Sequence, residues 1–390
     1  MHFKTKIFKG IWIHTFIILI LTSPLYAQSD FSFTYYIISD DNSFKNRNLY
    51  DEWINTFSLY TGYTFSGNPF LLRLYYTGDY STFTNYKERE NNAHIFGIAG
   101  IPFKSEDITI NLGASAKIRR NKSNYTYYDI NSYSFYANFL YEPQLTKIYT
   151  LGFNLQKNKF LEFSQIDNIE YRLWGRYQQF FQNKLSLMGD MGIGVKNYVN
   201  QKKMSFFGYV PGLIMPRARY VEEPINVLLF SSSINIGKSL TPKTGANLNV
   251  GGQLFISDPI ESFLDGVYYY TENDLYDDPY SYQNLYSNMN ITRVFGIGFQ
   301  GKIGVEYQKK NYKGTPALTN EGNASGNYRK DTRIDYSLLL SKTFFTDWKF
   351  PNTFDLFFRF LIRDNASNDP YYDYFDHLGI VGITIGFKSF

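Results

Sequence analysis

The sequence predicts an all-β chain that closes into a transmembrane antiparallel up-and-down barrel of about sixteen strands, with fourteen as the alternative. Three observations lead to this prediction. Short segments alternate in polarity with a period of two, and the connectors between them alternate between short and long. After Ala27, no run approaches the ~20 apolar residues that a membrane-spanning helix needs. If the chain crosses a membrane, it must therefore cross it with strands.

The N-terminus has the order of a secretory signal peptide. Lys4, Lys6 and Lys9 precede an apolar run over residues 11–21, and Ala27 is a small residue at the expected cleavage site. The apolar run is too short for a comfortable membrane span. We therefore expect export and removal of residues 1–27, with residues 28–390 forming one barrel domain.

Composition excludes several functional classes. Removing residues 1–27 removes three lysines, which lowers the formal net charge from +4 to +1. A nucleic-acid partner is not expected, because such proteins usually carry a basic excess. The absence of cysteine excludes disulfides and thiol-linked lipid. The 36 Tyr and 36 Phe favour strands, and tyrosine suits the border between lipid and water.

The alternating segments put successive side chains on opposite faces of a sheet. In residues 108–117, apolar Ile108, Ile110 and Leu112 alternate with Thr109, Asn111 and Gly113; residues 354–363 alternate in the same way. The other predicted strands begin near Phe31, Trp53, Phe70, Ala93, Asn131, Lys147, Ile166, Leu185, Asn226, Ala246, Asn284, Gly296, Asp331 and Leu378.

The connectors support hairpins with turns at one rim and loops at the other. Short connectors lie near residues 66–69, 103–107, 142–146, 181–184, 239–244 and 346–352, and a further tight turn is expected near Val294. The long connectors are residues 39–52, 81–92, 119–130, 158–165, 197–225, 257–283, 309–330 and 364–377. An even strand count then brings both ends of the barrel to the same rim.

Closure follows from hydrogen bonding. An unpaired backbone group in hydrocarbon costs several kcal/mol, so only helices and closed barrels span a membrane. The chain ends in an apolar strand, residues 379–390, which would be an exposed edge in an open sheet. In a barrel this strand pairs with the first one. A barrel of ~16 strands leaves an aqueous lumen, which agrees with a mean hydropathy of -0.33.

With its signal peptide, alternating strands, asymmetric connectors and terminal Phe390, the chain resembles bacterial outer-membrane β-barrels of the porin-like group. The resemblance implies integral insertion in the outer membrane after export. It also implies a barrel assembly machinery that reads Phe390 as part of its signal. The apolar register at this end falls on Val381, Ile383, Ile385 and Phe387 rather than on the positions that alternate back from Phe390.

The polar registers predict the residues that line the lumen. The pore-lining candidates are Arg73, Lys117, Glu170, Arg172, Arg176, Asp190, Lys196, Lys302, Glu306, Arg333, Asp335, Asp355, Arg359 and Arg363. Asp79 belongs to the same set, in which basic positions outnumber acidic ones nine to six. Such an excess favours anionic solutes. The alternative is that the charges pair across neighbouring strands and only keep the lumen wet.

Two long loops differ in sign, because residues 257–283 are acidic and residues 197–225 are basic. The apolar run in the basic loop predicts a constriction folded into the barrel, built from Pro211, Leu213, Ile214, Met215, Arg217 and Arg219. The alternative is that this run packs against other loops outside. The acidic loop lacks the residue order of a calcium loop, so no metal site is expected.

The remaining motifs give little evidence for cofactor binding or catalysis. GIGFQG at residues 296–301 matches the dinucleotide pattern G-x-G-x-x-G, but strand alternation follows it instead of a helix. His94 and His377 both lie near predicted strand starts, and His377 has Asp373 and Asp376 close in sequence. No nucleophile motif accompanies them, so neither enzymatic activity nor a cofactor is expected.

The leading functional hypothesis is a channel for passive diffusion of small hydrophilic solutes, mildly anion-preferring. One alternative is an adhesin or receptor that binds a partner through its long, tyrosine-rich loops. The other is an outer-membrane hydrolase that uses His377. The identity of the solutes and the choice between monomer and homo-oligomer stay open at this point.

Overall fold

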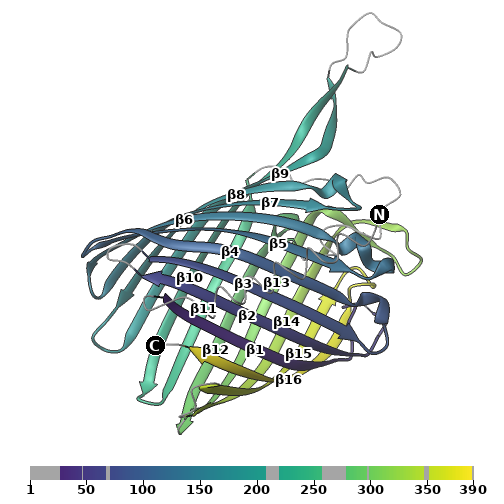
Figure 1. Cartoon of the computed structure of the whole chain (residues 1–390). Coiled ribbons are helices and arrows are strands. Elements are labelled where there is room, and N and C mark those ends of the chain that lie inside the picture. Colours follow the sequence, from purple (N-terminus) through teal and green to yellow (C-terminus); the bar gives the residue numbers. More distant parts are fainter. Residues whose placement is uncertain are drawn as a thin grey trace, which may run out of the picture.

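The computed structural model describes residues 27–45, 47–66, 71–207, 219–256, 278–296, 298–346 and 351–388. These residues form one closed antiparallel barrel in which each strand pairs with its neighbours in the sequence and β16 pairs with β1 (Figure 1). Helical structure in the described ranges is limited to short 3-10 segments, and none is long and apolar enough to cross a membrane. The predicted sixteen-strand barrel is confirmed.

The strands have the following bounds. The first eight are β1 (Ala27–Asp40), β2 (Glu52–Ser66), β3 (Leu71–Phe83), β4 (Asn91–Lys104), β5 (Ile108–Asn121), β6 (Ile130–Gln144), β7 (Lys147–Phe160) and β8 (Asn168–Phe180). The second eight are β9 (Leu185–Phe207), β10 (Arg219–Thr241), β11 (Thr244–Phe255), β12 (Tyr282–Gly296), β13 (Phe299–Leu318), β14 (Ala324–Phe345), β15 (Thr353–Ser367) and β16 (Tyr374–Lys388). Four 3-10 segments, η1 (Lys87–Arg89), η2 (Ser123–Tyr128), η3 (Ser164–Ile166) and η4 (Pro279–Ser281), lie in long connectors.

The closing seam joins the two ends of the barrel in register. Asp30 lies opposite Lys388, and Asp40 lies opposite Leu378. The start of β1 and the end of β16 therefore share one rim, as an even strand count requires. Phe390 lies outside the described residues, as do residues 1–26, so the expected assembly signal and cleaved leader stay predictions.

Two expected loops are largely strand. The predicted loop 197–225 contributes paired residues up to Phe207 and again from Arg219, and the β9–β10 hairpin continues beyond the barrel rim (Figure 1). Residues 309–330 likewise extend β13 and β14. A polar sequence can continue a ladder in water, because each strand still satisfies the N–H and C=O groups of its neighbour. Alternation of apolar residues therefore underestimates the length of these strands.

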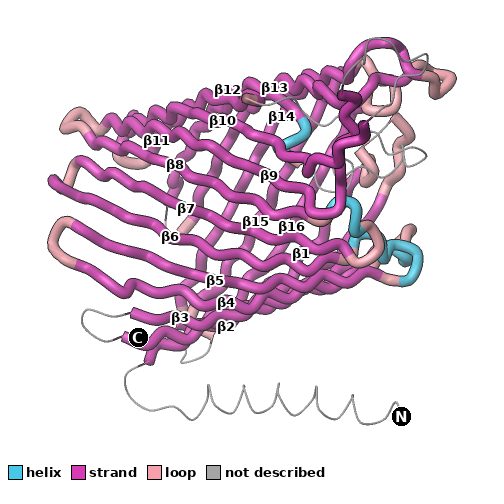
Figure 2. Tube along the Cα trace, turned by 90° about the horizontal axis from the view of Figure 1, so that it is seen from above, coloured by secondary structure: helices cyan, strands magenta, loops and turns pink. Residues whose placement is uncertain are grey.

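The outer face of the barrel is mostly apolar in the described strands. Register places Leu173 beside Ile193 and Ile234 beside Val250, and these side chains are about half exposed. A surface of this kind is stable only against hydrocarbon, since burying apolar area contributes about 25 cal/mol per Å². The strands that carry this face are long and tilted around the barrel (Figure 2).

Aromatic side chains gather on this outer face near the short-turn rim. The rings of Tyr141 and Tyr149 lie 6.1 Å apart, and those of Tyr149 and Tyr177 lie 5.1 Å apart. All three belong to the register of Phe139, Leu151 and Leu173, which faces outward. A row of tyrosines at one height is the arrangement by which outer-membrane barrels meet the lipid–water interface.

Candidate functional site: the charged inner wall

All fourteen predicted pore-lining residues lie on the face opposite to the apolar exterior. Paired residues of neighbouring strands point to the same face of the sheet. Following the pairs from strand to strand shows that Arg172, Asp190, Ser233 and Tyr286 share one face, and that Arg333 and the seam residues continue it. The candidate set is Arg73, Lys117, Glu170, Arg172, Arg176, Asp190, Lys196, Lys302, Glu306, Arg333, Asp335, Asp355, Arg359 and Arg363.

Contacts between strands that are not neighbours show that this face is concave. Arg73 of β3 forms an ion pair with Asp30 of β1 across the intervening β2. Arg172 of β8 donates a hydrogen bond to the Ser231 hydroxyl of β10 at 3.3 Å, across β9. Side chains two strands apart converge only on the inside of a curved sheet. The polar register is therefore the inner wall.

Gly62 makes the first of these contacts possible. It lies on β2 between Asp30 and Tyr75 in register, and a Cβ placed there would overlap Asp30, Tyr60 and Arg73. The Arg73 guanidinium also donates to the Tyr60 hydroxyl. The sequence predicted Arg73 as a lumen residue, but not Asp30, because no spacing rule links strands two apart.

Many inner-wall charges form ion pairs. Arg176 binds Asp190 at 2.6 Å, and Arg363 donates two hydrogen bonds of 3.0 Å to Asp335. Arg333 lies 3.3 Å from Glu306 and 3.4 Å from Asp335. Pairing lowers the field that these charges project into the lumen, because opposite charges a few ångströms apart largely cancel at longer range.

Four of the predicted pore-lining cations differ from these because they are not in ion pairs with described residues. Within the described ranges, Lys117, Arg172, Lys302 and Arg359 take part in no ion pair. Of the acidic members, Asp79 likewise has none, and Asp355 accepts its hydrogen bond from the Thr343 hydroxyl at 2.5 Å. The unpaired inner-wall charges of this set are thus mainly positive.

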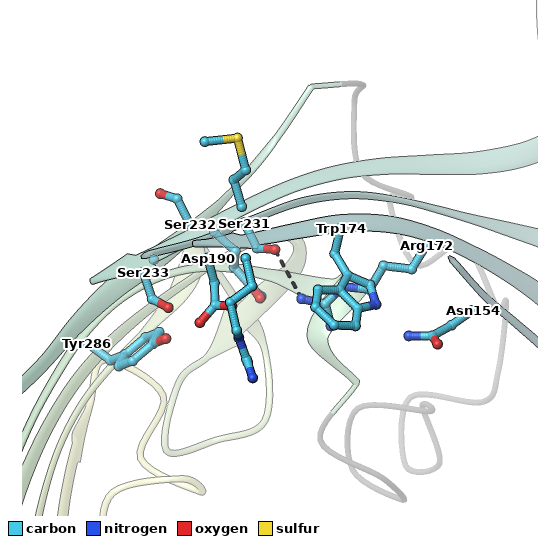
Figure 3. A pocket seen from close by; sticks show the side chains of 12 residues that line it. Asn154, Arg172, Trp174, Asp190, Ser231, Ser232, Ser233 and Tyr286 are labelled. Atoms are coloured by element: carbon cyan, nitrogen blue, oxygen red, sulfur yellow. Dashed lines mark hydrogen bonds and ion pairs between the residues drawn. The ribbon is translucent and has the colours of Figure 1, made fainter. Parts of the chain in front are cut away.

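A hollow of about 370 Å³ lies on the inner wall between β8 and β12 (Figure 3). Its lining combines two guanidinium groups, a carboxylate, an indole and several hydroxyls: Arg172, Arg176, Asp190, Trp174, Ser231, Ser233 and Tyr286. Figure 3 shows the hydrogen bond from Arg172 to Ser231 at its edge. Its lining could give polar and stacking contacts to a small hydrophilic molecule.

The turn before β12 folds against the inner wall. Lys196 of β9 is fully buried and lies 2.8 Å from Asp278, the residue before η4, and 3.5 Å from Glu170 of β8. Its ammonium also lies over the rings of Tyr198 and Tyr280, at 5.2 and 5.6 Å. The end of the predicted acidic loop is thereby fixed to strands that are distant in sequence. Residues 257–277 of that loop lie outside the described residues.

The same end of the lumen carries further pairs of cations and tyrosines. Lys310 lies 4.3 Å from the Tyr282 ring, and Arg329 lies 4.4 Å from Tyr312 and 3.3 Å from Tyr372. Partly desolvated cation–aromatic contacts of this kind are worth about 0.5–2 kcal/mol each. Tyrosines, which suggested lipid interfaces from sequence, therefore also bind cations on the inner wall.

The remaining predicted features have the following positions. Of the constriction candidates, Pro211, Leu213, Ile214, Met215 and Arg217 lie outside the described residues, and Arg219 begins β10 opposite Phe207. The constriction therefore stays a prediction. In the GIGFQG stretch, Gly296 ends β12, Gly298 has a φ of 68° before β13, and Gly301 is paired within β13, which continues as strand.

The rim histidines have partners that the sequence did not indicate. The His377 ring nitrogen Nδ1 lies 2.7 Å from Asp41, not from Asp373 or Asp376. His94 Nδ1 lies 2.8 Å from the Tyr76 hydroxyl. In the part of the chain that the structure describes, no serine hydroxyl is hydrogen-bonded to His377, and its carboxylate partner is Asp41.

The fold resembles that of several solved outer-membrane structures. Pseudomonas aeruginosa OccK2 (OpdF), in complex with glucuronate, aligns with a TM-score of 0.52 at 10% identity, over 93% of this chain and 98% of that one. Pseudomonas aeruginosa OpdL aligns at 0.51 and 11% identity, over 93% and 99%. Acinetobacter baumannii OccAB2 aligns at 0.51 and 10% identity, over 93% and 98%. The chain is a β-barrel of the outer-membrane type.

One family model matches part of the chain. The model of the surface lipoprotein assembly modifiers matches residues 250–386, which run from within β11 to near the end of β16. This is less than half of the chain, so the match is a similarity of its C-terminal wall. No curated protein matches the chain.

Proposed function

We propose that the barrel is a water-filled passage that lets small hydrophilic solutes diffuse across the outer membrane. The observation that carries this proposal is the closed sixteen-strand wall with all fourteen predicted charges on its inner face. A barrel of this size encloses more space than side chains fill. Polar inner side chains keep that space wet, so solutes need not leave water to cross.

The passage weakly prefers anions under this proposal. Among the described residues, Lys117, Arg172, Lys302 and Arg359 have no carboxylate partner, whereas most of the acidic candidates are paired. Wall charges that are not cancelled raise the local concentration of the opposite ion. The preference is weak because the paired charges contribute little field.

Planar-bilayer recording of the purified barrel tests both parts. The proposal predicts discrete conductance steps that grow with salt and a reversal potential on the anion side in a potassium chloride gradient. Arg359→Gln should move the reversal potential toward cation preference. Lys184→Gln, in the short β8–β9 turn, serves as a control and should leave it unchanged. A bilayer that stays closed would contradict the passage itself.

A second candidate function is surface assembly of lipoproteins, because the matching family model covers six consecutive strands, β11–β16. In this function the partner is an exported lipoprotein rather than a solute. Protease digestion of intact cells separates the two candidates. If the barrel assembles lipoproteins, a co-produced surface lipoprotein should be cleaved by the added protease only in cells that contain the barrel. If the barrel is a passive channel, cleavage of the lipoprotein should be the same with and without it.

A further inference from the structure

Three aspartates meet at the long-loop rim of the closing seam. Asp40 is the last residue of β1, Asp41 follows it, and Asp376 lies near the start of β16. One carboxylate oxygen from each lies within 4.8 Å of the others. The seam pairing that brings them together joins residues more than three hundred positions apart, so no local motif signals the cluster.

Two of the three carboxylates are buried. Asp376 is fully buried and Asp40 is 6% exposed. Within the described ranges, Asp376 Oδ1 is buried and has no hydrogen-bond partner, whereas its Oδ2 accepts from Lys45 at 2.6 Å. A buried carboxylate oxygen without a donor costs about 1–3 kcal/mol or more. Such an oxygen, placed among other carboxylates, is suited to ligate a cation.

The positive groups nearby do not balance the cluster. Lys45 contacts both oxygens of Asp40 at 2.9 Å as well as Asp376, and its side chain is 30% exposed. Arg363 lies opposite Asp376 in register but directs both of its hydrogen bonds to Asp335. His377 donates its backbone N–H to Asp41 Oδ1 at 2.6 Å, and its Nδ1 lies 2.7 Å from Asp41 Oδ2. One ammonium, that of Lys45, therefore serves the two buried carboxylates, and its side chain is in contact with solvent.

We propose that Asp40, Asp41 and Asp376 bind a divalent cation of the calcium type, which displaces the Lys45 ammonium. Calcium takes carboxylate oxygens at about 2.3–2.6 Å, so two ligands of one ion are separated by at most about 5 Å. The three carboxylate oxygens all lie within 4.8 Å of one another, which is inside this limit. Exposed Asp41 gives the ion a path from the medium, and backbone oxygens or water complete the shell. The bound ion fastens β1 to β16 at the rim.

Terbium luminescence of the folded barrel in detergent, excited through its aromatic residues and displaced by calcium, tests the site. The wild-type chain should bind terbium, and calcium should displace it. Asp41→Asn removes one charged ligand and should weaken binding at least about tenfold, because affinity follows ligand charge. Lys45→Met removes the competing ammonium and should strengthen binding. Calcium should raise the melting temperature of wild-type barrel but not that of Asp41→Asn.

Matched controls separate this site from general acidity. Asp373→Asn removes an exposed carboxylate three residues before Asp376 and should leave terbium affinity unchanged. Asp41 is partly exposed, so its substitution should not prevent folding, which the gel shift of the unheated barrel checks. Equal terbium binding by wild-type, Asp41→Asn and Lys45→Met chains would overturn the proposal. So would a melting temperature that does not respond to calcium.

Discussion

Replacing Lys196 by methionine tests whether the inner turn holds the mouth of the barrel. Methionine is similar in length to lysine, but it removes the ammonium, and with it the hydrogen bond to Asp278 and the cation–aromatic contacts with Tyr198 and Tyr280. Asp278 and Glu170 then lose their shared cation, while Asp278 keeps hydrogen bonds from the Tyr198 hydroxyl at 3.2 Å and the Tyr280 backbone N–H at 3.1 Å. The effect on stability therefore reports the loss of the buried ammonium, and the comparison with Asp278→Asn below separates the ion pair from the contacts with the rings.

The expected loss is large for a single substitution. Removing one partner of a buried ion pair costs about 3–5 kcal/mol, and the remaining donors to Asp278 place Lys196→Met near the lower end. Asp278→Asn should cost less, about 1–2 kcal/mol, since Lys196 keeps Glu170 at 3.5 Å. The double variant should lose less than the sum of the two single losses, because both substitutions remove the same interaction.

Denaturant unfolding of the barrel in lipid vesicles, followed by tryptophan fluorescence, measures these differences. The control is Arg176→Met, which removes an ion pair between β8 and β9 whose side chains are 41% and 26% exposed. An exposed pair contributes about 0–1 kcal/mol. Equal losses for Lys196→Met and Arg176→Met would refute the reasoning that burial makes the Lys196 pair important.

Two further predictions concern the wall itself. Gly62→Ala should cost up to about 1 kcal/mol, because the added Cβ displaces the side-chain ends of Asp30 and Tyr60 and so weakens the partly exposed Arg73–Asp30 pair, and the same unfolding experiment should show little further loss when Arg73→Gln is combined with it. Val250→Lys puts a charge on the lipid face at the middle of β11 and should cost about 2–4 kcal/mol, whereas Asn249→Lys on the inner face should cost under about 1 kcal/mol. Similar costs at positions 249 and 250 would contradict the assignment of faces.

The strands are predictable from the sequence because each one alternates between residues that face lipid and residues that face the lumen. In β5, apolar Ile110 and Leu112 face outward, and Asn111 and Lys117 face inward, so the period of two is present in every strand of this kind. The inner-wall residues follow from the same alternation. The pairing register between neighbouring strands agrees with this assignment of residues to the inner and outer faces.

Contacts between distant strands were not predictable. Lys196 meets Asp278 across 82 residues, and Lys45 meets Asp376 across 331. Barrel closure and the folding of a turn against the wall determine these pairs, and neither leaves a local pattern. The extended β9–β10 hairpin was also missed, because a ladder with water on both faces does not need apolar alternation.

Cysteine scanning of β5 tests the central claim most directly, since the chain has no cysteine of its own. Single cysteines at Asn111, Ser115 and Lys117 should react with a charged, membrane-impermeant thiol reagent in vesicles. Cysteines at Ile110, Leu112 and Ala114 should be protected by lipid. Alternating reactivity is the predicted result, and equal labelling of both sets would contradict a barrel with a wet interior and a lipid-covered exterior.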